Sequence, residues 1–208
     1  MPPQTLRAPA LVRGFIAIEL SPALRGRLKN IIAILRQATP PKAVSWVMAD
    51  NIHLTLKFLG DIPEKDIPPI SVALTEAAST VEPFSFSVSG LGCFPNFKRP
   101  RVLWAGIEPS SAKAVVGLQA AIEARLTPLG YPPEDRAFSP HLTLGRVRRE
   151  AHPAEAAKAG EAVRAQSRIE LGSAFVDAVT LMKSDLRPGG PVYTPLFTAT
   201  LGRATPPE

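Results

Sequence analysis

The sequence predicts an α+β fold: one bilobal domain in which two mainly antiparallel sheets line a central cleft, with helices outside. Three observations support this. The tetrapeptide His-Leu-Thr-Leu occurs twice, at residues 53–56 and 141–144. The same offset aligns two apolar runs, and a stripe of apolar residues at helical spacing follows each run. We therefore expect two repeats, about residues 14–94 and 101–186, related by a pseudo-twofold axis within residues 1–208.

Each repeat is expected to begin with a strand and a helix. The apolar runs over residues 15–20 and 103–108 predict the two strands. Proline and serine follow both runs, and these residue types are common where helices start. Two stripes then predict the helices, the first formed by Leu24, Leu28, Ile31 and Leu35 and the second by Val115, Leu118, Ile122 and Leu126.

The two His-Leu-Thr-Leu segments alternate polar and apolar residues, which predicts strands. Further helices are expected beyond them, and then further strands. The expected helices cover residues 68–79 and 153–166, the expected strands cover 84–88, 174–181 and 192–201, and loose ends are expected at 1–12 and 203–208.

Composition narrows the class of protein. Hydrophobic residues make up 45% of the chain and charged residues 20%, which is typical of a globular protein. The formal net charge of +6 favours a polyanionic partner. The single cysteine, Cys93, excludes an internal disulfide, and we expect a cytoplasmic protein without a signal peptide or a membrane span.

The paired motifs are the candidate site. Alternate residues of a strand share a face, so His53 and Thr55 should point one way while the leucines point to the core. The same holds for His141 and Thr143. Pseudo-symmetry would then bring two histidine–threonine pairs together across the cleft. A single pair of this kind would more simply be a hydrogen-bonded histidine on a sheet, but two of the three histidines occupy equivalent positions.

Two facing imidazoles suit in-line displacement at phosphorus. The nucleophile and the leaving group lie on opposite sides of the phosphorus, and histidine can act as acid or base near neutral pH. Threonine hydroxyls can donate hydrogen bonds to the non-bridging oxygens. Water attacking a cyclic phosphate would need no metal and no cofactor. No histidine or cysteine stands at metal-ligand spacing from either motif.

From residue 13 to residue 201 the sequence resembles the two-histidine phosphoesterase superfamily, and within it the RNA 2′,3′-cyclic phosphodiesterase branch. The strings that carry the resemblance are RGFIAIEL, SWV, NIHLTLKFLGDI, GCFPNFKRPRVLWAGI, FSPHLTLGRV and SDLRPGGPVYTPLFTATL. The resemblance implies opening of an RNA-terminal 2′,3′-cyclic phosphate to a 2′-phosphomonoester without a metal, with 2′-5′ ligation of RNA ends as a reverse-type activity. Transfer RNA fragments are candidate substrates, and a monomer is expected.

The resemblance also implies roles for residues. His53 matches the family's proton donor to the leaving 3′ oxygen, and His141 matches the acceptor that activates water. Thr55 and Thr143 match phosphate-contacting threonines, and Arg146 matches a family arginine. Strict alternation would turn Arg146 toward the core, unless Gly145 marks a bulge that redirects it. A salt-bridged arginine at the rim is the other interpretation.

Some residues carry weaker expectations. Asp50 stands where the family more often has glutamate. In a regular strand Lys57 would lie on the same face as His53, where it could approach a phosphate. It could also be a solvated lysine. Trp46 and Phe58 are expected in the core or the cleft wall, and His152 on the surface. A basic cluster beside two phenylalanines fits either an RNA-contacting loop or a solvated hairpin with anchoring rings. It comprises Lys98, Arg99 and Arg101, beside Phe94 and Phe97.

Two rival functions are also compatible with the sequence. The same site could act on small cyclic nucleotides or 2′-5′-linked oligonucleotides, because the sequence does not fix the size of the cleft. A non-catalytic RNA-binding protein would also have a basic face. The intact histidines and threonines argue against that alternative, since lysine or arginine would bind phosphate as well.

Overall fold

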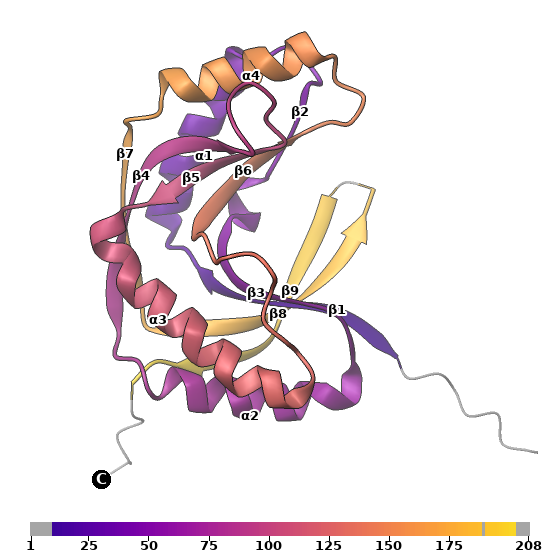
Figure 1. The fold of residues 1–208 in the computed structure, drawn as a ribbon, viewed down its shortest axis with the longest axis vertical. Helices are drawn as coiled ribbons and strands as arrows, with labels where there is room; N and C mark the ends of the chain where they lie inside the picture. Colours follow the sequence, from indigo (N-terminus) through magenta and orange to yellow (C-terminus); the bar gives the residue numbers. More distant parts are fainter. Residues whose placement is uncertain (1–9, 189, 203–208) are drawn as a thin grey trace, which may run out of the picture.

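The computed structural model describes residues 10–188 and 190–202, and within them the chain forms four α-helices around one curled antiparallel sheet (Figure 1). The predicted α+β class is confirmed. The strands are β1 (Leu11–Glu19), β2 (Val44–Trp46), β3 (His53–Pro63), β4 (Phe84–Phe94), β5 (Val102–Ile107), β6 (His141–Val147), β7 (Glu170–Val176), β8 (Ala178–Arg187) and β9 (Gly190–Thr200). The helices are α1 (Pro22–Gln37), α2 (Ile67–Ala78), α3 (Pro109–Leu126) and α4 (Pro153–Ala165).

The two halves of the sheet join at the motif strands. The strand order is β7-β4-β5-β6-β3-β1-β8-β9, and β2 pairs with the outer end of β6. Strands β3 and β6 share a single register pair, Leu54 with Leu142. We expected two separate sheets facing each other. The structure instead has two half-sheets continuous through this one pair, so the two motifs are direct neighbours.

Each half of the sheet contains strands from both predicted repeats. Strand β4 follows the first motif in sequence but pairs with β5, and β8 follows the second motif but pairs with β1. The helices divide in the same way. Helices α1 and α4 contact each other on the half that contains β7, and α2 and α3 contact each other on the other half (Figure 1). We had expected each repeat to form its own lobe, but exchange of the third strands links the lobes.

The helices start and pack as the sequence predicts. The Ser21 side chain accepts a hydrogen bond from the Leu24 amide, and Pro22 occupies the first turn of α1. All eight residues of the two predicted stripes are at most 2% exposed. The leucines of both motifs are also buried, so one core lies between the sheet and the helices.

Three elements differ most from expectation, and β4 also runs on to Phe94, beyond the expected 84–88. Strand β2 was not predicted, because three residues carry too little periodicity to mark a strand. The expected strand over residues 174–181 is two strands, β7 and β8, which meet at Asp177. The expected loose start contains Leu11 and Val12, which begin β1, while residues 1–9 and 203–208 lie outside the described residues. None of the described helices is long and apolar enough to cross a membrane.

Candidate active site

The register of β3 and β6 brings the two motifs onto one face of adjacent strands. Leu54 and Leu142 are paired and fully buried, so their neighbours in each strand point to the opposite, concave face of the sheet. One residue further along each antiparallel strand, His53 lies across from Thr143 and Thr55 lies across from His141. Both predicted histidine–threonine pairs therefore meet at one place.

Backbone carbonyl groups orient both imidazoles in the same way. The Nδ1 atom of His53 lies 2.9 Å from the Asn51 carbonyl oxygen, and that of His141 lies 2.7 Å from the Ser139 carbonyl oxygen. A carbonyl oxygen can only accept, so Nδ1 carries the proton and donates in both rings. Each neutral imidazole therefore has its Nε2 lone pair available to take a proton, which is the geometry of a general base.

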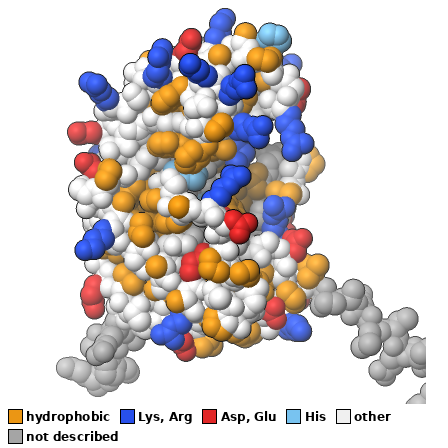
Figure 2. Space-filling model, viewed as in Figure 1, with side chains coloured by type: hydrophobic (Ala, Val, Ile, Leu, Met, Phe, Trp, Pro, Cys, Tyr) orange, Lys and Arg blue, Asp and Glu red, His pale blue; other side chains and the backbone are white. Residues whose placement is uncertain are grey.

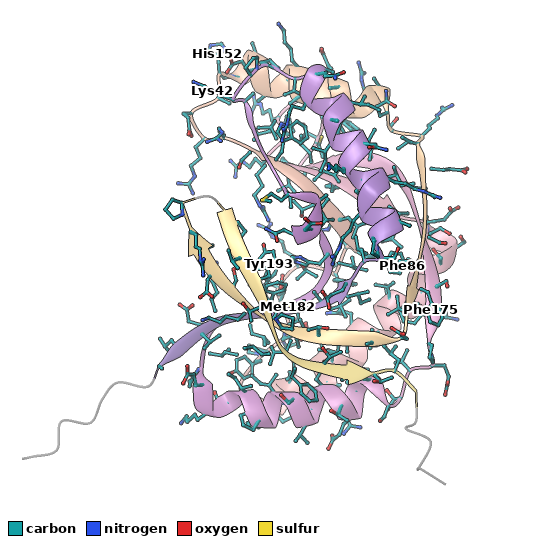
Figure 3. The ribbon with its side chains drawn as sticks, turned by 180° about the vertical axis from the view of Figure 1, so that it is seen from behind. Lys42, Phe86, His152, Phe175, Met182 and Tyr193 are labelled. Atoms are coloured by element: carbon teal, nitrogen blue, oxygen red, sulfur yellow. The ribbon has the colours of Figure 1, made fainter. Side chains whose placement is uncertain are left out.

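Aromatic rings flank His53. The Phe15 ring stacks on the imidazole with centroids 4.7 Å apart, and the Tyr193 ring meets it edge-on at 5.1 Å. Tyr193 and Met182 come from the neighbouring strands β9 and β8 (Figure 3). Phe15, Ala17 and Met182 form a small apolar cluster separate from the main core.

A second aromatic pair flanks His141. The Phe94 ring lies edge-on to the imidazole at 5.0 Å, and the Trp104 ring lies 6.5 Å away. Trp104 can take this position because Gly92 faces it across the strands. A Cβ atom at residue 92 would come within 2.2 Å of the indole ring. The absence of a side chain there therefore allows the indole to lie against the backbone of β4.

The surroundings lower the pKa of both histidines. Burial is the largest cause for His53 and brings its pKa to about 4, and the positive charge of Arg25 acts in the same direction. Burial also lowers the pKa of His141, assisted by the positive charge of Arg146. The hydrogen bonds to the Asn51 and Ser139 carbonyl groups oppose these shifts. Both imidazoles are therefore neutral at pH 7 without a substrate.

A bulge in β6 directs Arg146 to the concave face. Trp104 pairs with Thr143 while Leu103 pairs with Gly145, so Leu144 is an extra residue in the ladder. The extra residue reverses the alternation. Gly145 is consequently buried, and Arg146 is exposed on the same face as Thr143. Its positive charge lowers the pKa of His141 and also acts on Tyr193, in agreement with a position on this face.

A corresponding bulge in β3 corrects the expectation for Lys57. Ile16 pairs with Lys57 while Ala17 pairs with Thr55, so Leu56 is the extra residue. Lys57 therefore points away from the concave face, where it could not reach a phosphate held by His53. It is 2% exposed and donates hydrogen bonds to Glu123 and to the Pro132 carbonyl oxygen. Phe58 takes the concave face instead, beside Phe15.

The weaker predictions divide between the site and the scaffold. Phe97 packs against the core and Phe94 against His141, while Lys98 and Arg99 are exposed. In this loop the phenylalanines are therefore anchored, and the cations remain open to solvent. Trp46 packs against the core, as one of the two interpretations had it.

Two other predicted surface residues also have clear positions. Asp50 is exposed in a short 3-10 turn before β3. His152 is exposed, as predicted, and caps α4 by accepting a hydrogen bond from the Ala154 amide. Neither belongs to the pair of motifs.

Sequence reasoning missed two residues at the site. The Asn51 side chain donates a hydrogen bond to the Pro191 carbonyl oxygen at 2.8 Å, while its own carbonyl group orients His53. It thereby ties the β8–β9 hairpin to the first motif. Tyr193, two residues beyond Pro191, packs on His53 as a result. Neither contact was visible in the sequence, because each joins segments about 140 residues apart.

Positive charge gathers on one side of the site. The space-filling view shows a histidine in a hollow of this face, with Lys and Arg side chains beside and above it (Figure 2). Acidic side chains are fewer there and lie mainly around the edge of the view (Figure 2). An anionic ligand would approach such a surface favourably.

Comparisons with known proteins agree with this geometry. The sequence profile of the family described as LigT like Phosphoesterase matches residues 18–104 and 106–193. A protein of Methanothermobacter thermautotrophicus named RNA 2′,3′-cyclic phosphodiesterase is 36% identical over 183 residues, covering 88% of this chain and 95% of that protein. A protein of the same name from Archaeoglobus fulgidus is 34% identical and covers 89% of this chain and 98% of its own.

Solved structures show similarity to the same family. The crystal structure of Escherichia coli LigT complexed with NADP+ superposes with a TM-score of 0.72 at 26% identity, covering 93% of this chain and 100% of that one. A crystal structure of a Thermus thermophilus protein has a TM-score of 0.70 at 31% identity, covering 92% and 100%. By its matched sequence, its curled sheet and its paired motifs, this chain belongs to the LigT-like phosphoesterase family.

Proposed function

We propose that the protein hydrolyses the 2′,3′-cyclic phosphate at RNA ends to a 2′-phosphomonoester, using two histidines and no metal ion. The observation that carries the proposal is the Leu54–Leu142 pair, because it brings both histidine–threonine pairs to one face. Membership of the phosphoesterase family and the names of the relatives support the substrate class.

In the proposed reaction, His141 is the base. Its Nε2 takes a proton from water, and the water oxygen attacks the phosphorus as the bond from phosphorus to O3′ breaks. His53 gives a proton to O3′, which leaves as a hydroxyl group, and the phosphate remains on O2′. In-line displacement needs the base and the acid on opposite sides of the phosphorus, which suits two imidazoles on adjacent strands.

His53 needs a proton before it can act as the acid. With a pKa of about 4 it is neutral in the free protein at pH 7. A bound phosphodiester brings a negative charge close to the ring, and an opposite charge favours the protonated imidazole. In this proposal the substrate itself therefore helps to protonate its acid catalyst.

Three further side chains would bind the phosphate. Thr55 and Thr143 would donate their hydroxyl protons to the non-bridging oxygens, where charge grows in the transition state. Arg146 would add a positive charge from the His141 side. Its exposure leaves the guanidinium able to form the paired hydrogen bonds that arginine makes to phosphate.

The finer expectations belong to the same proposal. We infer a monomer made of one bilobal domain with two repeats, about residues 14–94 and 101–186. It would act in the cytoplasm on RNA ends, with transfer RNA fragments as candidates. Ligation of 2′-5′ ends would be the same ring opening with a 5′-hydroxyl in place of water, so that the P–O3′ bond breaks and a 2′-5′ phosphodiester forms.

The deciding experiment supplies the purified protein with an oligoribonucleotide that ends in a 2′,3′-cyclic phosphate. The expected product carries a 2′-phosphate, identified by mass and by its NMR coupling to the 2′ carbon. Mononucleoside 2′,3′-cyclic phosphates and 2′-5′-linked oligonucleotides serve as competitors. Faster turnover of either would favour the alternative substrate class, and RNA binding without any turnover would favour a non-catalytic protein.

A further inference from the structure

A small pocket lies between the start of α1 and the 3-10 turn Ala49–Asn51, which directly precedes the first motif. One face of the first two turns of α1 forms one wall, and the 3-10 turn forms the other. The lining residues are Pro22, Arg25, Gly26 and Lys29 from α1 and Ala49 and Asp50 from the turn. The volume is about 240 Å³, below the roughly 300 Å³ at which pockets for whole small molecules begin. This Arg25 pocket therefore suits a compact group such as a phosphate.

Arg25 lines the pocket with donors that the protein does not use. Its Nε is buried and has no hydrogen-bond partner among the described residues. Its ion-pair partner Glu19 lies 3.7 Å from a terminal nitrogen, which is too far for a hydrogen bond. A guanidinium carries five N–H donors, and a buried donor without a partner is costly. A phosphate oxygen would supply the missing acceptor.

Gly26 leaves the surface between the two cations open. Glycine is unfavourable in the interior of a helix compared with alanine. A Cβ atom at residue 26 would meet no other atom within 4 Å, so the packing of the protein does not require glycine there. Its missing side chain gives a ligand access to the space between Arg25 and Lys29.

The pocket lies on the side of His53 that the leaving oxygen faces. Glu19 stands directly across from His53 at the end of β1, on the concave face and on the far side from β6. Arg25 pairs with Glu19, and its charge lowers the pKa of His53, in agreement with a nearby position. In the proposed reaction the ribose lies on the His53 side of the phosphorus, away from the attacking water. Its 5′ carbon can therefore extend toward Arg25.

We propose that Arg25, with Lys29, binds the phosphate that joins the terminal nucleotide to the rest of the RNA. This inference rests on the proposed function. Glu19 and Asp50 add two negative charges nearby, so net charge does not hold this phosphate. The unused donors of Arg25 and the ammonium group of Lys29 hold it instead. A mononucleoside cyclic phosphate lacks the group, so the pocket distinguishes RNA ends from small cyclic nucleotides.

The experiment compares two substrates that differ by one phosphate. They are adenosine 2′,3′-cyclic phosphate and its 5′-phosphorylated form, and the preference is the ratio of their kcat/KM values. This ratio cancels any change in the chemical step that both substrates share. Arg25→Met removes the donors, and Gly26→Leu fills the pocket while both cations remain. Gly117→Leu is the matched control, because Gly117 is also an exposed glycine inside a helix, with no atom within 4 Å of an added Cβ.

The wild type should prefer the 5′-phosphorylated substrate about tenfold, as expected for charge-assisted hydrogen bonds to one phosphate. Arg25→Met and Gly26→Leu should each reduce the preference to about one, and Gly117→Leu should keep the wild-type value. Thermal melting shows whether each variant is folded.

Equal kcat/KM values for the two substrates in the wild type would overturn the phosphate site. A preference that survives in Arg25→Met or in Gly26→Leu would also overturn it, while the proposed function would stand. A wild-type protein that turns over neither substrate would instead overturn the proposed function, and this inference with it.

Discussion

Lys57 and Glu123 form an ion pair inside the fold, with Nζ and Oε2 2.5 Å apart. The pair joins β3, just after the first motif, to α3. Lys57 also donates to the Pro132 carbonyl oxygen at 2.7 Å, and Gln119 donates to the second carboxylate oxygen of Glu123. A lysine buried at this position needs such partners, because a buried charge is costly when it is unpaired.

Lys57→Met should therefore lower the free energy of unfolding by about 3 kcal/mol, since it leaves Glu123 charged without its partner. The double variant Lys57→Met with Glu123→Met should recover most of this loss, because both charges are then gone. Urea unfolding measures all three proteins. Arg125→Ala is the control: it breaks an equally short but half-exposed pair with Glu76 and should cost less than about 1 kcal/mol. A Lys57→Met protein as stable as that control would contradict the argument.

Local patterns predicted most of the elements, and long-range pairing explains the rest. The stripes of α1 and α3 and the alternation of both motifs are short-range signals, and the structure has them where they were expected. The exchange of β4 and β8 between the half-sheets involves no local signal. A chain with the same repeats could pair each third strand within its own lobe. Only the packing of the whole molecule therefore decides which strands pair.

The two bulges show which features of the site itself the sequence could not predict. Glycine often marks a bulge, so Gly145 indicated a possible bulge in β6. The expectation for Arg146 took this possible bulge into account. The bulge in β3 has Leu56 and Lys57 and no glycine. No nearby residue indicates this bulge, because Glu123, the partner that stabilises the buried lysine, is 66 residues away in the sequence. For this reason Lys57 was misplaced, and Phe58 was expected only in the core or the cleft wall.

Activity should persist in the presence of a chelator. The proposed charges on phosphate are balanced by Thr55, Thr143, Arg146 and the two imidazoles, so removal of divalent ions should leave kcat/KM unchanged. Turnover of a cyclic phosphate after dialysis against EDTA checks this. Loss of turnover that returns on adding a divalent cation would contradict the metal-free mechanism.

Stability should fall as the pH drops from about 6.5 to about 4. The folded state holds the pKa of His53 near 4, below its value of about 6.5 in an unfolded chain. Between these values only the unfolded state binds the proton, so acid favours unfolding, and above pH 6.5 the effect vanishes. The full effect is about 3 kcal/mol. Urea unfolding at several pH values measures it, and His53→Gln should show a smaller slope. Equal slopes would show that His53 is not the group responsible.

Binding of RNA should depend on salt more strongly than binding of a mononucleotide. The exposed cations Lys98 and Arg99 lie outside the histidine site, where only the further phosphates of an oligonucleotide could reach them. KM for an oligonucleotide should rise with salt more steeply than KM for a nucleoside 2′,3′-cyclic phosphate. Replacing both cations by alanine should reduce the oligonucleotide slope by up to about 2, because each cation neutralises at most one phosphate. Identical slopes for the two substrates would exclude the loop from RNA binding.

The division of labour between His53 and His141 can be tested with a substrate that needs no acid. The profile of kcat/KM against pH should be bell-shaped, and His53→Ala or His141→Ala should each lower kcat/KM about 100-fold or more. The double variant should be little worse than either, because the two act as a unit. A substrate with sulfur in place of O3′ expels a thiolate, which leaves without a proton because a thiol is far more acidic than an alcohol. This substrate should rescue His53→Ala and should not rescue His141→Ala, which still lacks the base for water. Rescue of His141→Ala alone would mean that the acid and base roles are reversed.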